Sequence, residues 1–212
     1  MRCVRTIAPL GLALMCCGCG TVSQSKYTAC QSQNRSLTEQ TRAQQHAPDL
    51  HYLFAPLKHA RLDYMVQKAT EMGAARLRPV MTRRTMAERV NIERMRANAI
   101  EAAEQCGILR ILAIDEPQKL ERVVAGWDPA RTLIFCDEGS EKRCPFTALA
   151  KVQPGPLALL VGPEGGFEDG ERELLASQPF VVRISLGPRI LRADTAAVAA
   201  LALVNAALGD WR

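Results

Sequence analysis

Hydrophobic positions between residues 61 and 208 follow two alternating patterns. Apolar side chains that recur at helical spacing, as in Leu62, Met65, Val66, Ala69 and Met72, predict helices at 61–73, 88–105, 118–125, 169–177 and 195–208. Short apolar runs predict strands at 76–82, 131–136, 157–161 and 181–186, and 108–114 is an apolar, β-branched run. This alternation indicates an α/β fold with a mostly parallel sheet covered by helices on both faces.

Residues 1–50 have a different pattern. Arg2 and Arg5 precede an apolar run at 7–15, and small, cysteine-rich residues follow at 16–20. A charged start, a short apolar core and small residues around a cysteine are typical of a secretory signal peptide, and they resemble the start of a bacterial lipoprotein. The run is too short to span a bilayer as a helix.

The stretch at 21–45 is rich in Ser, Gln, Thr and Asn, which predicts a solvated linker without stable structure. We therefore divide the chain into a leader with its linker, 1–50, and a folded body, 51–212. A frayed tail, or a foreign leader joined to the body, are the other interpretations of residues 1–50.

Composition narrows the class of protein. Among 212 residues, 48% are hydrophobic and 23% are charged, which excludes wholesale disorder and a protein with many membrane spans. The net charge of +5 divides into +3 for residues 1–50 and only +2 for the body. Nucleic-acid binding therefore cannot be argued from bulk charge.

The cysteines argue against a disulfide framework or a metal site in the body. Five of the eight lie in the first thirty residues, and Cys106, Cys136 and Cys144 are scattered without a CxxC pair. No HExxH motif occurs, and all three histidines lie before the helix at 88–105. We expect reduced thiols, a cytosolic body and no metal.

The loops after three predicted strands, at 137–140, 162–167 and 187–192, are candidates for a ligand site. In parallel α/β sheets, ligands bind beyond the carboxyl ends of the strands, and Gly and Pro let a ligand approach the backbone closely. The loops contain neither GxxxxGK[ST] nor GxGxxG, so no phosphate cradle or dinucleotide site is indicated. The residues alone predict a backbone-lined pocket for a small organic ligand, although such turns also follow many strands that bind nothing.

Two C-terminal motifs resemble one known family. LVGPEGGF at 160–167 and SLGPRILRADTA at 185–196 are similar to the bacterial 16S ribosomal RNA uracil-N3 methyltransferase family, RsmE, of the SPOUT class. LDYMVQKATEMG at 62–73 and IEAAEQCG at 100–107 extend the resemblance over about 51–212. It implies a C-terminal deep trefoil knot, S-adenosylmethionine (SAM) as cofactor, 16S rRNA of the small ribosomal subunit as substrate, and a homodimer in the cytoplasm.

The resemblance also implies site residues. Those expected to bind the cofactor are Val161, Gly162, Pro163, Glu164, Gly165, Leu186, Gly187, Ile190, Leu191 and Thr195. The loop after Cys136 is a weaker candidate for the same pocket. Because uracil N3 becomes nucleophilic only when its proton leaves, a cation near the carbonyl oxygens would stabilise the developing charge, and Arg192 is the candidate. Arg192 could instead brace the loop through Asp194 or Glu164, and Glu164 is either a turn-stabilising carboxylate or a proton acceptor.

One departure from the family concerns the N-terminus. The family begins with a small RNA-binding β-barrel of the PUA type, whereas residues 1–50 show no strand alternation. The alternatives to an active methyltransferase are therefore a catalytically impaired, knotted SAM-binding module and an exported lipoprotein. A methyltransferase needs the cofactor and the ribosome, both cytoplasmic, so we expect the protein to act in the cytoplasm rather than at a membrane.

Overall fold

The computed structural model describes residues 23–45, 49–87, 89–139 and 144–211. Contacts between residues divide the chain into two units, 1–39 and 40–212. The signal-like segment at 7–20, with four of the eight cysteines in or near it, lies outside the described residues. In the parts of the chain that are described, no helix combines the length and apolar character needed to cross a membrane.

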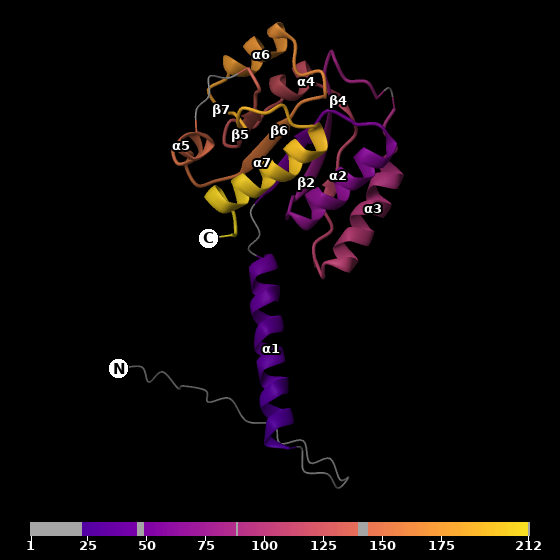
Figure 1. The fold of residues 1–212 in the computed structure, drawn as a ribbon, viewed down its shortest axis with the longest axis vertical. Helices are drawn as coiled ribbons and strands as arrows, with labels where there is room; N and C mark the ends of the chain where they lie inside the picture. Colours follow the sequence, from indigo (N-terminus) through magenta and orange to yellow (C-terminus); the bar gives the residue numbers. More distant parts are fainter. Residues whose placement is uncertain (1–22, 46–48, 88, 140–143, 212) are drawn as a thin grey trace, which may run out of the picture. The chain divides into compact units, whose positions relative to one another are not determined.

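The polar stretch before the body forms a helix, α1 (Gln24–Gln45), so the prediction of a linker without stable structure is wrong there (Figure 1). No Gly or Pro interrupts this stretch, and the hydroxyls of Thr28 and Thr38 donate to the carbonyl oxygens four residues earlier. Side chains 23–38 are exposed. Burial therefore does not account for this part of α1.

The body is built on a parallel sheet, as the alternating pattern predicts. Strand order is β3-β2-β1-β6-β5-β7, and β4 pairs separately with β2. Every described pairing is parallel. The strands are β1 (Leu50–Phe54), β2 (Arg76–Met81), β3 (Ala113–Ile114), β4 (Gln118–Lys119), β5 (Thr132–Cys136), β6 (Leu157–Val161) and β7 (Val181–Ile184).

Strand β1 lies near the middle of the sheet, between β2 and β6, and the hydrophobic pattern did not reveal it. Four of its five residues are buried. The division between 50 and 51 cuts this strand, so the folded body begins before residue 51. The run at 108–114 also differs, because only Ala113 and Ile114 are paired with β2.

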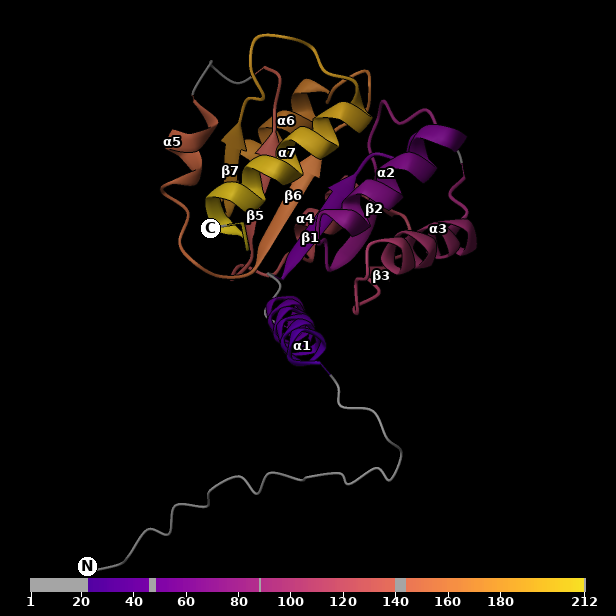
Figure 2. The same ribbon diagram turned by 60° about the horizontal axis from the view of Figure 1, so that its bottom comes forward.

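Helices cover both faces of the sheet (Figures 1 and 2). One core cluster joins the sheet to α2 (His59–Glu71), α3 (Ile92–Gln105), α5 (Pro145–Leu149) and α7 (Ala193–Leu208), and a second joins its other face to α4 (Leu120–Ala125) and α6 (Asp169–Ala176). Helix α3 begins later than predicted because the Asn91 side chain accepts from the Arg94 N–H and caps it. Helix α5 was not predicted.

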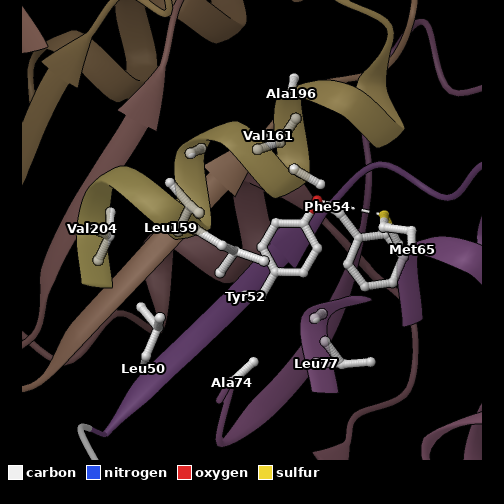
Figure 3. Packing of buried hydrophobic residues seen from close by; sticks show 14 of the residues in the cluster. Leu50, Tyr52, Phe54, Met65, Ala74, Leu77, Leu159, Val161, Ala196 and Val204 are labelled. Atoms are coloured by element: carbon white, nitrogen blue, oxygen red, sulfur yellow. Dashed lines mark hydrogen bonds between the residues drawn. The ribbon is translucent and has the colours of Figure 1, made fainter. Parts of the chain in front are cut away.

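The larger core cluster is centred on two aromatic residues of β1 (Figure 3). Tyr52 and Phe54 are buried, and their rings stack with centroids 5.4 Å apart. The Tyr52 hydroxyl donates to the Met65 sulfur at 3.4 Å, and burial raises the pKa of this phenol well above its usual value. The core thus ties α2 to the centre of the sheet and leaves the carboxyl ends of the strands to form the site.

Candidate active site

A cavity opens beyond the carboxyl ends of β5, β6 and β7, where the sequence predicts a ligand site. Its space, open mouth included, is about 790 Å³. Three loops and the first turn of α7 line it: Cys136, Asp137, Glu138, Val161, Gly162, Pro163, Glu164, Gly166, Phe167, Ser185, Leu186, Gly187, Pro188, Arg189, Ile190, Leu191, Ala193 and Ala196.

Most of the residues predicted to bind a cofactor meet in this cavity. Those lining it are Val161, Gly162, Pro163, Glu164, Leu186, Gly187, Ile190 and Leu191. The described lining does not include Gly165, Arg192 or Thr195. The loop after β5, the weaker candidate, contributes two residues, Asp137 and Glu138. Ser185 and Arg189 also line the cavity, and the sequence did not single them out within the second motif.

Two glycines of the first motif are required by the shape of the loop. At Gly162 an added Cβ would collide with the Phe167 ring, which packs edge-on against Phe135 with centroids 4.9 Å apart. Gly166 has φ +69°, a left-handed conformation that side chains disfavour, and its N–H donates to the Pro163 carbonyl oxygen at 2.9 Å. The loop therefore turns sharply above β6 and folds Phe167 back beneath the cavity.

The loop after β2 holds the first motif from outside the cavity. The Arg84 guanidinium donates to the Gly165 carbonyl oxygen at 2.8 Å. The buried Glu171 carboxylate accepts from the Arg83 N–H at 2.9 Å and from the Glu168 N–H at 3.0 Å, the latter as part of a capping box at the start of α6. The contacts of Arg83 and Arg84 join segments more than eighty residues apart in the chain and explain how the loop keeps its position.

The two residues predicted to take part in catalysis lie in different surroundings. The Glu164 carboxylate forms an ion pair with Arg61 of α2, a contact that favours a stabilising role for this carboxylate over that of a proton acceptor. Arg192 is exposed and is the residue that precedes α7, so its backbone lies between the lining residues Leu191 and Ala193. Arg189 is the arginine in the described lining itself.

A buried carboxylate closes the β5 side of the cavity. The Asp137 side chain is 1% exposed, and it accepts from Arg183 at 2.6 Å and from the Gly139 N–H at 3.0 Å. Arg172 lies 3.8 Å from Asp137 and 3.2 Å from Glu138, so it links the two carboxylates. Beside them, burial raises the pKa of the Cys136 thiol to about 12, which keeps this thiol protonated and unreactive.

Metal binding has no visible basis in the described part of the chain. No three His, Cys, Asp or Glu side chains gather there in a way that could hold an ion. The four described cysteines, Cys30, Cys106, Cys136 and Cys144, are free. The cavity therefore offers apolar side chains, backbone groups and carboxylates, which suit a polar organic ligand better than a cation alone.

Comparison with known proteins identifies the family of this fold. The model of the RNA methyltransferase domain matches residues 44–205. The chain belongs to this family. The match begins before β1 and ends within α7, so it covers the sheet and all three loops of the cavity.

Curated members of the family are similar to this chain over part of their length. The ribosomal RNA small subunit methyltransferase E of Rickettsia conorii is 33% identical over 71% of this chain and 62% of the relative. That of Bacillus subtilis is 31% identical over 70% of this chain and 62% of the relative. The chain thus spans less than two thirds of the length of these relatives.

Solved structures of similar proteins contain the same fold. A Legionella pneumophila protein, Lpg2936, assigned as a methyltransferase and solved with bound SAM, has a TM-score of 0.65 and 32% identity over 76% of this chain and 67% of its own. A ribosomal RNA small subunit methyltransferase E from Neisseria gonorrhoeae, bound to SAM, has a TM-score of 0.70 and 24% identity over 78% of this chain and 68% of its own. This chain therefore shares its parallel α/β architecture with both of these proteins.

Proposed function

We propose that this protein transfers a methyl group from SAM to N3 of a uridine in the 16S rRNA of the small ribosomal subunit. The observation that carries the proposal is the meeting of both C-terminal motifs, GPEGGF and LGPRIL, around one cavity at the carboxyl edge of the sheet. Similarity to ribosomal RNA small subunit methyltransferases E supports the substrate.

The residues around the cavity fit SAM, which carries an adenine, a ribose and a charged amino acid. Apolar lining residues, among them Val161, Leu186 and Leu191, suit the adenine ring, and the half-exposed carboxylate of Glu138 suits hydroxyl or ammonium donors. Gly187, where an added Cβ would meet nothing within 4 Å, leaves the backbone open to close approach by a ligand. When bound, the cofactor supplies an activated methyl group, so the chain need not provide a covalent nucleophile.

The contribution of the chain to the reaction is then orientation and charge stabilisation. The loops hold the reacting groups in line and exclude water, a form of catalysis by proximity. We assign to Arg192 the stabilisation of negative charge on the uracil carbonyl oxygens as the N3 proton leaves. Arg189, which lines the cavity, is the second candidate for this role, and the Arg61–Glu164 pair braces the loop.

Methylation of small ribosomal subunits that lack this modification tests the proposal directly. With radiolabelled SAM, label should appear in 16S rRNA, and digestion to nucleosides should place it on uridine N3. Arg192→Ala should lower kcat by roughly 10² to 10³ with little change in cofactor affinity, and Arg189→Ala serves as the parallel variant. If the wild-type protein binds SAM in calorimetry but transfers no label to the rRNA, the proposal is wrong and the protein is a SAM-binding module without this activity.

We also propose that the protein acts in the cytoplasm as a homodimer through α7, and that its C-terminal segment is knotted. Helix α7 buries one face against its own chain, while Val198, Ala199 and Ala202 on other faces are apolar and only half-buried. Such a surface is suited to a second copy of the chain. Light scattering should give twice the chain mass of 23.3 kDa, and a single 23 kDa species at high micromolar concentration would reject the dimer.

A further inference from the structure

Positive charge is concentrated at one side of the carboxyl edge, beside the cavity. The loops after β1 and β2, with the first turn of α2, carry Lys58, Arg61, Arg83, Arg84 and Arg89, and the acidic residue in the same segments is Glu88. Arg61 and Arg83 have carboxylate partners on other elements, Glu164 and Glu121, so the local excess comes from Lys58, Arg84 and Arg89. Strands β1 and β2 are parallel neighbours, so the loops that follow them lie next to each other. The near-neutral charge of the whole body conceals this local excess.

A groove runs between these two loops. Lys58 lines it from the start of α2 and Arg89 from the segment before α3, and both side chains are exposed. Its apolar wall includes Leu57, Val90 and Met86, the last of which is 70% exposed. A positively charged groove with an apolar wall can hold both a phosphate backbone and bases.

The acidic residues of the groove have cationic partners of their own. Asp63 accepts from the Arg94 guanidinium at 2.6 Å, and Glu93 lies 2.9 Å from Arg96. The contacts that the structure describes for Lys58 and Arg89 include no carboxylate. Charge complementarity thus favours a polyanion as occupant.

The groove also leads to the cavity. Arg61, one turn along α2 from Lys58, pairs with Glu164 of the cavity lining, and Arg84 of the loop after β2 contacts the Gly165 carbonyl oxygen. A strand that entered the cavity with one nucleotide would have its neighbouring phosphates close to this groove.

We propose that the groove between Lys58 and Arg89 binds the single-stranded RNA segment that flanks the target nucleotide. This inference rests on the proposed function, since RNA is the substrate there. Lys58 and Arg89 contact phosphates, which contributes affinity without base specificity, and Met86 and Val90 contact the bases.

The test is RNA binding by the full-length Lys58→Ala/Arg89→Ala double variant, measured by fluorescence anisotropy with a labelled oligouridine of about 12 nucleotides. Loss of two phosphate contacts should reduce the slope of log affinity against log salt by about 1.4, which is about a tenfold loss of affinity near 0.15 M salt. The matched control is Arg122→Ala/Lys151→Ala, at two exposed cations on the segments that lead into the amino ends of β5 and β6. It should leave both quantities unchanged.

Several outcomes would overturn the inference. They are an unchanged salt slope in the double variant, an equal loss in the control, or no binding of oligouridine by the wild type. Labelled polyglutamate that binds as tightly, with the same sensitivity to Lys58 and Arg89, would assign the groove to an acidic protein segment instead. Calorimetric SAM affinity, which neither variant should alter, shows that the fold is intact. A wild type that binds RNA with this slope but methylates no ribosomal subunits would contradict the proposed function and leave the groove assignment standing.

Discussion

At the scale of single residues, a buried arginine organises the amino edge of the sheet, opposite the cavity. The Arg131 guanidinium donates to the carbonyl oxygens of Asp49 and Leu157 at 2.8 and 2.9 Å, and to the Asp49 carboxylate at 2.5 Å. His51 lies in the same cluster, with its Nε2 3.3 Å from Asp49. Burial, followed by the charge of Arg131, lowers the pKa of His51 to about 4.

This cluster predicts a loss of stability in mild acid. The pKa of His51 is lower in the folded chain than its usual 6.5. The neutral imidazole therefore contributes fully to the free energy of unfolding above pH 6.5, and this contribution is lost as the pH falls toward 4. Burial alone would raise the pKa of Asp49, but the hydrogen bond from Arg131 and the positive charge of Arg131 outweigh it and lower that pKa. The Asp49 carboxylate therefore stays ionised across this range. The free energy of unfolding, measured by urea denaturation, should decrease by about 1–3 kcal/mol between pH 6.5 and pH 4. His51→Asn should flatten the dependence, and an equally steep profile in that variant would contradict the assignment.

A second residue-scale prediction concerns the glycine at the end of β6. Gly162→Ala should destabilise the fold by about 1–3 kcal/mol and weaken SAM binding, because the added methyl group displaces the Phe167 ring. Gly170→Ala is the matched control, since its added methyl group meets nothing within 4 Å and it lies within α6. Thermal unfolding and calorimetry on both variants provide the measurement. If both variants unfold at the same temperature and bind SAM equally well, the close contact between Gly162 and the Phe167 ring does not matter for stability or binding.

At the scale of elements, helix α6 positions the first motif through one buried carboxylate. Glu171 caps α6 through the Glu168 N–H and also accepts from the loop after β2. A single side chain therefore couples the start of a helix to two loops. Together with the contact between Arg84 and the Gly165 carbonyl oxygen, it connects the loop after β2, which does not line the cavity, to the cavity wall.

Replacement of this carboxylate should affect stability and cofactor binding together. Glu171→Ala leaves two backbone N–H groups without their acceptor and should cost about 1–3 kcal/mol in unfolding free energy, with weaker SAM binding. Glu173→Ala, at an exposed position of the same helix, should change neither by more than about 0.5 kcal/mol. Urea denaturation and calorimetry measure the two effects. A stability loss with unchanged cofactor affinity would confine Glu171 to helix capping.

At the scale of the whole molecule, the folded body depends on β1. This strand pairs with β2 on one side and β6 on the other, and it carries Tyr52 and Phe54 into the larger core cluster. Removal of β1 would separate the β2–β3 edge from the part of the sheet that forms the cavity.

A pair of truncations tests this dependence. A chain starting at residue 49 should keep cooperative unfolding and SAM affinity, because the paired strands begin at Leu50. A chain starting at residue 57 loses the whole of β1 and should not fold cooperatively, since several fully buried side chains and two ladders of hydrogen bonds are removed. Circular dichroism and differential scanning calorimetry distinguish the outcomes. Cooperative unfolding of the shorter chain would show that the sheet forms without its central strand.

The sequence by itself determined the features that depend on neighbouring residues. Helical spacing in 61–73 and the apolar runs at 131–136 and 157–161 predicted a parallel sheet with helices on both faces, because periodicity is a local property. Gly162 and Gly187 marked turns for the same reason. The motif resemblance then selected eight residues that line one cavity.

Only the tertiary structure decided which distant residues meet. Strand β1, LHYLF, has a histidine within its apolar run and was recognised only with β2 and β6 beside it. Arg61 and Glu164 are 103 residues apart, and Arg84 and Gly165 are 81 apart, so their contacts follow from strand order and not from spacing. Strand order also placed Lys58 and Arg89 in one groove, a local concentration of charge that the small net charge of the body does not reveal. Polar partners depend on the path of the chain through space, and local periodicity carries no information about that path.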